Sequence, residues 1–330
     1  MFDILPGTLY HWYHDHISDY LPDKSCGKWP NSSILDVDED TGELLKEQPV
    51  PILKPENIGE QMCIDDKAIG RDGYTILVLC TKYAVLSNTE TGKIAMMIES
   101  TKSDELESAL SIFGDDLKKI KSISCDMSPT YLKLCREQLP HAETVIDKFH
   151  LMGYLYDAVL DVRSRIRKKL AEGLSKGKKK TDKDKEILGE MELLKRCRHR
   201  LTQSPYKWTE QTSEMFKHIF SKHKDLKTAY DLSQDFKIWY DKNNCQKNKT
   251  QIKEGLYKWY NQVKEANLDE MLPVVKMIRK HEEQIMNYFS FGHTNAKAEN
   301  LNGKIQRFVA ANYGIRNKDF ALYRIAGYFS

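Results

Sequence analysis

The chain of 330 residues has no long hydrophobic run. A membrane-spanning helix needs about 20 consecutive apolar residues, and no stretch of that length occurs, so the sequence predicts no membrane span and no membrane partner. The first residues also lack a basic segment followed by an apolar stretch, so no signal peptide is expected. We therefore predict a cytoplasmic location.

Closely spaced cysteine pairs and a strong charge imbalance are also lacking. The seven cysteines are scattered and none forms a C-x-x-C pair, which favours reduced thiols over disulfides or a zinc cluster. The formal net charge is only +3. Composition therefore permits nucleic-acid binding without requiring it, and a basic surface must arise from local clusters.

Strand and helix signals divide the chain into four parts. Residues 1–58 have no sustained period and predict an irregular arm, residues 59–150 predict an α/β segment, residues 151–285 a helical block, and residues 286–330 a last helix with a short tail. Alternation and turn residues place strands at 62–65, 74–80, 93–98, 120–125 and 143–146, and helices at 104–113 and 130–138. Ser128 followed by Pro129 predicts the N-cap of the second of these helices.

Acidic residues close two of the predicted strands. Asp65 and Asp126 each end an apolar, β-branched run, and Glu299 lies in a helix predicted to begin near Thr294. Open α/β sheets bind ligands at strand ends, and magnesium prefers oxygen ligands. The three carboxylates therefore predict a hard-cation site and metal-assisted phosphoryl transfer. The alternative for a single strand-end aspartate is a turn or helix-capping role.

Five segments carry a resemblance to a known family. They are 64–66 (Ile-Asp-Asp), 125–131 (Cys-Asp-Met-Ser-Pro-Thr-Tyr), 146–150 (Ile-Asp-Lys-Phe-His), 294–302 (Thr-Asn-Ala-Lys-Ala-Glu-Asn-Leu-Asn) and 313–317 (Tyr-Gly-Ile-Arg-Asn). In order and context they resemble the DDE transposases of bacterial insertion sequences in the ISL-three family, over roughly residues 60–325.

The resemblance implies an α/β fold with a ribonuclease-H-like mixed sheet, flanked by helices and interrupted by an all-helical insertion. Residues 59–150 and 286–330 would then form the catalytic core, in which Asp65, Asp126 and Glu299 hold two Mg²⁺ or Mn²⁺ ions. The implied reaction is cleavage of DNA 3′ ends followed by strand transfer of an insertion sequence. Where the family usually has Asp-Glu this chain has Asp65 and Asp66, and alternation along a strand favours Asp65 by sending Asp66 to the opposite face.

Other residues are candidates for auxiliary and DNA-binding roles. Asp147 and His150 resemble a D/C-x-x-H element whose histidine lies near the DNA, although a histidine at a strand-to-helix junction can also be merely hydrogen-bonded in place. Phosphate contacts are predicted for basic side chains of the helical block and the tail, with a solvated face as the alternative. These side chains are Arg163, Arg165, Arg167, Lys178, Lys179, Arg307 and Arg316. For Trp208, Trp239 and Trp259 we expect core packing, with base stacking as the alternative.

The resemblance also predicts partners. Element ends and target DNA would be the substrates, in a synaptic complex built from copies of the chain, and the protein would be bacterial and associated with the nucleoid. The family's upstream zinc module and helix-turn-helix are not visible in residues 1–60, so end recognition is expected on a separate polypeptide, as in the ISAon-like split group. Two other functions stay open: a structure-specific nuclease without strand transfer, and an inactive transposase-derived DNA-binding protein.

Overall fold

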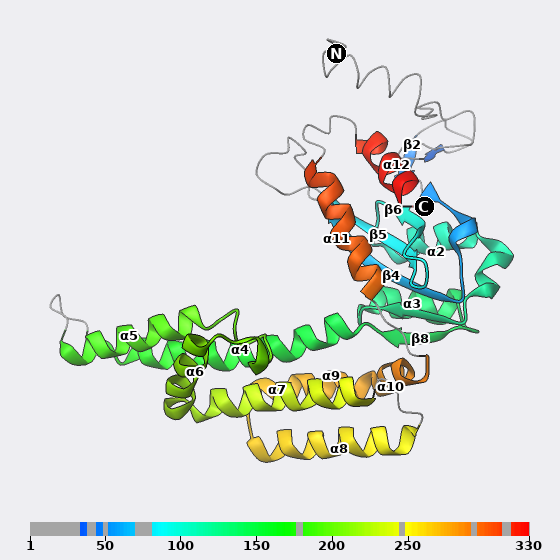
Figure 1. The fold of residues 1–330 in the computed structure, drawn as a ribbon. Helices are drawn as coiled ribbons and strands as arrows, with labels where there is room; N and C mark the ends of the chain where they lie inside the picture. The colour runs from blue at the N-terminus through cyan, green and yellow to red at the C-terminus, as the bar shows by residue number, and fades with distance from the viewer. Residues whose placement is uncertain are drawn as a thin grey trace, which may run out of the picture. The chain divides into compact units, whose positions relative to one another are not determined.

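The computed structural model describes most of the chain as two units (Figure 1). The described residues are 34–37, 44–48, 52–69, 81–175, 181–243, 248–291, 296–311 and 318–329. One unit, called the sheet unit below, combines Met1–Asp147 with His293–Ser330, and the other, the helical unit, is Lys148–Gly292. The chain therefore leaves the sheet unit, builds the helical unit and returns. From sequence we had placed the helical block at 151–285.

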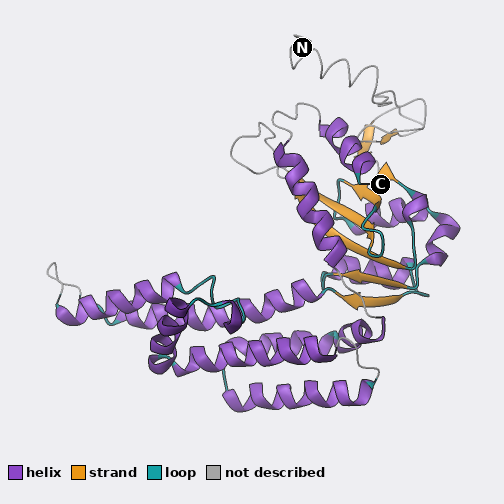
Figure 2. Ribbon diagram, viewed as in Figure 1, coloured by secondary structure: helices purple, strands orange, loops and turns teal. Residues whose placement is uncertain are grey.

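The sheet unit is built on six strands. They are β3 (Ile52–Leu53), β4 (Gln61–Ile69), β5 (Thr81–Asn88), β6 (Ile94–Ile98), β7 (Ser122–Cys125) and β8 (Glu143–Ile146). Their order across the sheet is β3-β6-β5-β4-β7-β8. The strands β4, β5 and β6 pair antiparallel, whereas β7 pairs parallel with both β4 and β8. This mixed sheet, with helices on both faces, is the predicted ribonuclease-H-like fold (Figure 2).

Two groups of helices cover the sheet. The elements are η3 (Pro55–Asn57), α2 (Ser103–Ser111), η4 (Gly114–Lys119), α3 (Pro129–Gln138), α11 (Ala296–Ala311) and α12 (Lys318–Tyr328). On one face Ile64, Ala84 and Leu86 form a core cluster with side chains of α2 and α3. On the other face Val85 and other strand residues cluster with side chains of α11 and α12. Helices that precede the helical unit in the sequence (α2 and α3) and helices that follow it (α11 and α12) thus bury the same sheet.

The structure differs from the sequence prediction at the start of the chain. A hairpin forms between β1 (Ile34–Val37) and β2 (Leu44–Gln48), and β3 adds an edge strand beside β6. Residues 1–58 were predicted to be irregular. The strands were missed because they are two to five residues long, and such short runs, broken by proline, show no period.

The central strand β5 was also missed. The sequence predicted a strand at 74–80, which lies outside the described residues, and assigned none to Thr81–Asn88. Tyr83, Ala84, Val85 and Leu86 are all buried, because helices cover both sides of this strand. A strand buried on both faces loses the alternation of apolar and polar residues that reveals strands in a sequence.

The helical unit consists of helices alone in its described residues. They are α4 (Lys148–Glu172), α5 (Asp182–Arg196), η5 (Pro205–Lys207), α6 (Glu210–Lys222), α7 (Lys224–Asn243), α8 (Lys249–Ala266), η6 (Asp269–Met271), α9 (Leu272–Lys280) and α10 (Glu282–Phe291). The last two of these helices, α9 and α10, meet at His281. Among the described helices, none combines the length and the apolarity that crossing a bilayer requires.

Aromatic side chains form much of the core of the helical unit. The indole N–H of Trp259 donates to the carbonyl of Leu232 at 2.8 Å, and that of Trp239 donates to the carbonyl of Ile252 at 2.9 Å. A Cβ atom at Gly255 would lie 2.7 Å from Cδ1 of Trp239, so a glycine is needed where α8 approaches this ring. Both indoles are therefore fixed in helix packing, as expected for core residues.

We predict that Ile305→Ala destabilises the sheet unit by about 2–5 kcal/mol, the usual cost of removing a buried aliphatic side chain. Ile305 is buried against the sheet in the cluster that includes Val85. The measurement is native-state hydrogen exchange of the β5 amides. Gln306→Ala, at an exposed position on the same helix, should change their protection little, and equal effects of the two variants would contradict the packing of α11 described here.

Candidate active site

Three aspartates stand level with one another on adjacent parallel strands: Asp65 lies within β4, and Asp126 and Asp147 directly follow β7 and β8. The register pairs Cys63 of β4 with Ser124 of β7, so two residues further on Asp65 stands level with Asp126. Pairing of Cys125 with Ile146 continues the same row, so Asp126 stands level with Asp147 at the end of β8. The main-chain N–H of Asp147 donates to the carbonyl of Cys125 at 2.8 Å, which holds the row together. We call Asp65, Asp126 and Asp147 the acidic row.

The two neighbouring aspartates of β4 belong to opposite faces of the sheet. Asp65 pairs with Val85, which lies in the cluster under α11 and α12. Asp66 pairs with Ala84, which lies in the cluster under α2 and α3. Directly opposed residues of antiparallel strands share a face. Asp65 is therefore on the face covered by α11, the helix that carries Glu299.

Hydrogen bonds at the start of α3 involve Asp126 of the acidic row and also Asp66, the neighbour of Asp65. The carboxylate of Asp126 accepts the N–H of Ser128 at 2.8 Å, and the Ser128 hydroxyl, as the N-cap, accepts the N–H of Tyr131 at 3.3 Å. The Tyr131 hydroxyl in turn donates to the carboxylate of Asp66. Asp126 is thus a capping residue of the turn, which was the alternative role that the sequence left open, and it is also a member of the row.

Negative charge accumulates where these aspartates meet. Burial raises the pKa of Asp66 above its ordinary value, and the charges of Asp126 and Asp65 raise it further. The hydrogen bond from Tyr131 and the positive charge of Lys82 act in the opposite direction and lower the pKa of Asp66. A positive charge placed near these carboxylates would favour their ionised form.

Metal binding by the complete triad depends on Glu299. The helix α11 packs along β4, the strand of Asp65, but the side chain of Glu299 lies outside the described residues. Among the side chains that the structure does describe, no group of three or more His, Cys, Asp or Glu is arranged to hold a metal ion. The pair Asp65 and Asp126 is therefore the part of the predicted triad that the described side chains bring together.

The other predicted auxiliary residues fall in different units. Asp147 is buried and closes the acidic row in the sheet unit. His150 lies in the first turn of α4, in the helical unit, where its ring contacts Phe149 edge-on.

A mixed sheet of this order, with carboxylates at the ends of its parallel strands, defines a ribonuclease-H-like enzyme core. The family model of the ISL-three DDE transposases, described as "Transposase", matches residues 62–325. The chain belongs to this family and is a DNA transposase, so its substrate is DNA, and the resemblance read from the sequence is confirmed. Enzymes of the DDE type use divalent metal ions.

Other comparisons add little. The chain is similar to a solved structure of the Drosophila P element transposase strand transfer complex, with 10% identity over 83% of this chain and 77% of that chain. The TM-score of 0.34 is too low to support an argument about this protein. No curated protein sequence matches the chain.

The three arginines predicted to bind DNA along α4 differ in exposure. Arg163 is only 7% exposed, and its guanidinium donates to the carbonyl of Leu194 at 2.9 Å. The prediction of a DNA contact is corrected for this residue, because its polar group serves the packing of α4 against α5. Arg165 is ion-paired with Glu270 at 2.6 Å and with Asp225 at 3.1 Å. Arg167 is half-buried on the same helix.

The remaining predicted DNA contacts lie elsewhere. Lys178, Lys179 and Arg316 are outside the described residues. Arg307 is exposed on α11, eight residues after Glu299, which corresponds to about 12 Å along a helix axis.

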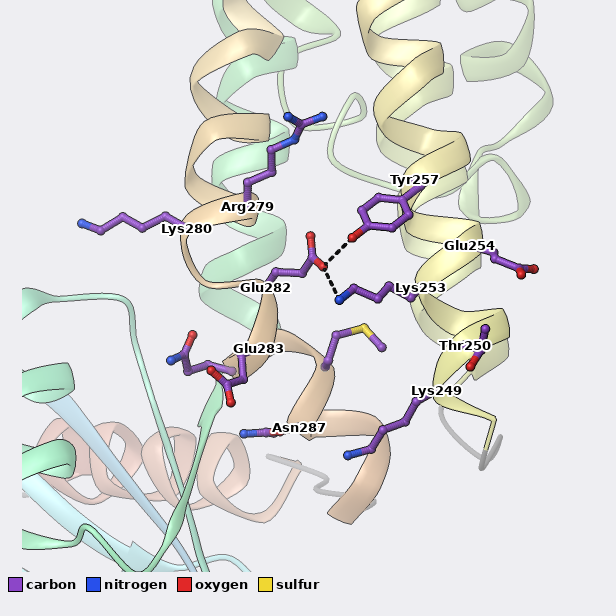
Figure 3. A pocket seen from close by; sticks show the side chains of 12 residues that line it. Lys249, Thr250, Lys253, Glu254, Tyr257, Arg279, Lys280, Glu282, Glu283 and Asn287 are labelled. Atoms are coloured by element: carbon purple, nitrogen blue, oxygen red, sulfur yellow. Dashed lines mark hydrogen bonds and ion pairs between the residues drawn. The ribbon is translucent and has the colours of Figure 1, made fainter.

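Two clefts of the helical unit contain basic side chains, of which Arg165 alone was among the DNA contacts predicted from sequence. The larger, of about 850 Å³, lies between α8 and the pair α9–α10 and includes Lys249, Lys253, Arg279 and Lys280 (Figure 3). There Glu282 accepts the Tyr257 hydroxyl and is ion-paired with Lys253, each at 3.3 Å. The smaller, of about 420 Å³, is lined by five basic or imidazole side chains: Arg165, Lys169, Lys222, His223 and Lys224. Lys222, His223 and Lys224 are consecutive in the sequence, but only the fold brings them beside Arg165 and Lys169 of α4.

We predict that Arg163→Ala lowers the free energy of unfolding of the helical unit by about 1.5–3 kcal/mol, since a hydrogen bond from a charged donor is lost. Hydrogen exchange of α4 and α5 amides measures this change. Lys168→Ala, at an exposed position on α4, is the control and should leave exchange unchanged. DNA affinity should be equal in wild type and Arg163→Ala, and a clear loss would restore Arg163 as a DNA contact.

Proposed function

We propose that this transposase cleaves DNA at the 3′ ends of an insertion sequence and joins the freed ends to target DNA, using Asp65, Asp126 and Glu299 as its catalytic carboxylates. The observation that supports this most directly is the parallel register, which sets Asp65 and Asp126 level on adjacent strands. Repulsion of Asp66 by both residues supports their closeness. Glu299 is included because α11, which carries it, packs along β4.

The carboxylates would hold two Mg²⁺ or Mn²⁺ ions. When bound, such ions activate a nucleophile at neutral pH and neutralise charge that develops on the phosphate. Asp65 and Asp126 orient the site through the strands that carry them, and the Ser128 N–H fixes one oxygen of Asp126. In the first reaction water breaks a phosphodiester and leaves a 3′-hydroxyl. In the second that hydroxyl attacks a target phosphodiester and displaces its 3′ oxygen.

The proposal also gives roles to the other site residues. Asp147, as the third member of the acidic row, would adjust the charge around Asp126, and Asp66 would stay on the face of α3. His150 would lie near DNA at the start of α4. For backbone phosphates we retain Arg165, Arg167, Lys178, Lys179, Arg307 and Arg316.

We also propose that the active form is a homo-oligomer. An element has two ends, and one chain supplies a single set of catalytic carboxylates, so paired cleavage calls for at least two copies. Recognition of the ends would depend on a separate polypeptide. Mass measurement of the protein with paired end fragments tests the first point, and a band-shift of the end sequence with and without the candidate partner tests the second.

Asp126→Asn should abolish Mg²⁺-dependent strand cleavage. The loss should exceed the roughly 10–100-fold that removal of an outer-shell partner costs, because a ligand itself is lost. The assay is cleavage of an end-containing duplex, followed by joining of precut ends. Asp115→Asn is the matched control, since Asp115 is an exposed acid of the same unit, with a side chain 92% exposed.

Near-normal cleavage by Asp126→Asn would refute the assignment. Cleavage by wild type without any joined product would instead indicate a nuclease that performs no strand transfer.

We expect Arg307→Ala to weaken DNA binding and to reduce the slope of log affinity against log salt concentration by about 0.9, the value for one lost phosphate contact on duplex DNA. Titrations at several salt concentrations give the slope. Arg136→Ala is the control, because Arg136 is an equally charged, 73% exposed side chain on α3. Identical slopes for wild type and Arg307→Ala would remove this residue from the DNA interface.

A further inference from the structure

A chain of hydrogen bonds connects the end of β7 to the middle of β4. It runs from the carboxylate of Asp126 to the N–H of Ser128, from the Ser128 hydroxyl to the N–H of Tyr131, and from the Tyr131 hydroxyl to the carboxylate of Asp66. It begins at Asp126, a member of the acidic row, and ends at Asp66, which follows Asp65 of the same row in the sequence. The start of α3 thereby links the two strands at the level of the active site.

The Tyr131 side chain is a fixed support for this connection. It is 2% exposed and packs in the cluster that contains Ile64 and Cys125, which directly precede Asp65 and Asp126 in the sequence. Ser128 caps α3, so the backbone that presents Tyr131 is held as well. A buried ring on a capped helix has few alternative positions, and its hydroxyl therefore defines where the Asp66 carboxylate lies.

Fixing Asp66 also fixes Asp65. The two residues share a peptide unit, and successive side chains of a strand point to opposite faces. Holding Asp66 on the face of α3 therefore holds Asp65 on the face of α11. Without the hydroxyl, the half-buried Asp66 carboxylate would lose a partner within reach of the negative charges of Asp65 and Asp126, and this part of β4 would lose the side-chain contact that adds to its main-chain pairing.

We infer that Tyr131 is a positioning residue of the active site: through Asp66 it sets the place of Asp65 relative to Asp126 and so tunes the affinity for the divalent cation. This inference rests on the proposed function, in which Asp65 and Asp126 hold that cation. Tyr131 itself touches neither the cation nor the DNA.

Tyr131→Phe tests the inference because it removes the hydroxyl and keeps the ring. We expect the Mn²⁺ concentration at half-saturation to rise about ten-fold, the lower end of the cost of losing an outer-shell partner. Direct titration of the DNA-free protein, with free Mn²⁺ followed by its electron paramagnetic resonance signal, measures this. In cleavage assays the Mg²⁺ dependence should shift in parallel, while the KM for DNA stays unchanged.

Tyr230→Phe is the matched control in the helical unit. Tyr230 is also 2% exposed, and its hydroxyl donates to the carbonyl of Gln203 at 2.8 Å. Both variants lose one tertiary hydrogen bond, so both are expected to melt at somewhat lower temperature. Only Tyr131→Phe should change Mn²⁺ affinity, and an equal shift in the two variants would reduce the effect to general stability.

Substitutions of Asp66 change the acceptor of the same hydrogen bond, and they provide a second test if Tyr131→Phe does not fold. Asp66→Asn keeps an oxygen that accepts the tyrosine hydroxyl and should bind Mn²⁺ within about three-fold of wild type, whereas Asp66→Ala should match Tyr131→Phe. In the double variant Tyr131→Phe/Asp66→Ala the loss should equal that of either single change, because both remove one interaction.

Three results would overturn the inference: unchanged Mn²⁺ affinity in Tyr131→Phe, additive losses in the double variant, or a loss in Asp66→Asn as large as in Asp65→Asn, which would make Asp66 a ligand. Failure of the proposed function has a different signature. In that case wild-type protein binds no Mn²⁺ and Asp126→Asn cleaves DNA normally.

Discussion

Parallel pairing of β4 with β7, and of β7 with β8, determines where the acidic side chains of this protein lie. The main-chain hydrogen bonds of the sheet set Asp65, Asp126 and Asp147 level with one another, so closeness of like charges is enforced by the backbone. A one-residue slip of β4 would break this row, because side chains alternate between faces and Asp65 would move to the other side of the sheet. Helices on both faces bury the strands and make such a slip costly.

Short-range sequence patterns correctly predicted one strand and one helix cap next to the site. The strand at 143–146 and the Ser128 cap of α3 were correct, because alternation and Ser-Pro are short-range signals. The prediction that Asp65 and Asp66 point to opposite faces followed from alternation and agrees with the register, although the catalytic role of Asp65 stays a prediction. The contact of Tyr131 with Asp66 spans 65 residues, and no local pattern encodes it.

Burial explains most of what the sequence did not reveal. Strand β5 is buried on both sides and lost its alternation. Arg163 was read as part of a basic surface because α4 carries several arginines, yet its side chain is turned into the helical unit. A run of charged residues in the sequence does not show which of them are exposed, because exposure depends on which side of the helix packs against a neighbouring helix. Trp239 and Trp259 show the opposite case, in which an amphipathic context correctly predicted packing.

The interruption of the sheet unit by the helical unit has a consequence for synthesis of the protein. Asp147 completes the row early, but α11 follows only after Lys148–Gly292 has been made. At roughly 5–20 residues per second on the ribosome, the segment from position 148 to position 299 takes on the order of ten seconds or more. Until then the nascent chain has the strands of the sheet without α11, so the apolar face that α11 covers in the finished protein has to wait for its partner.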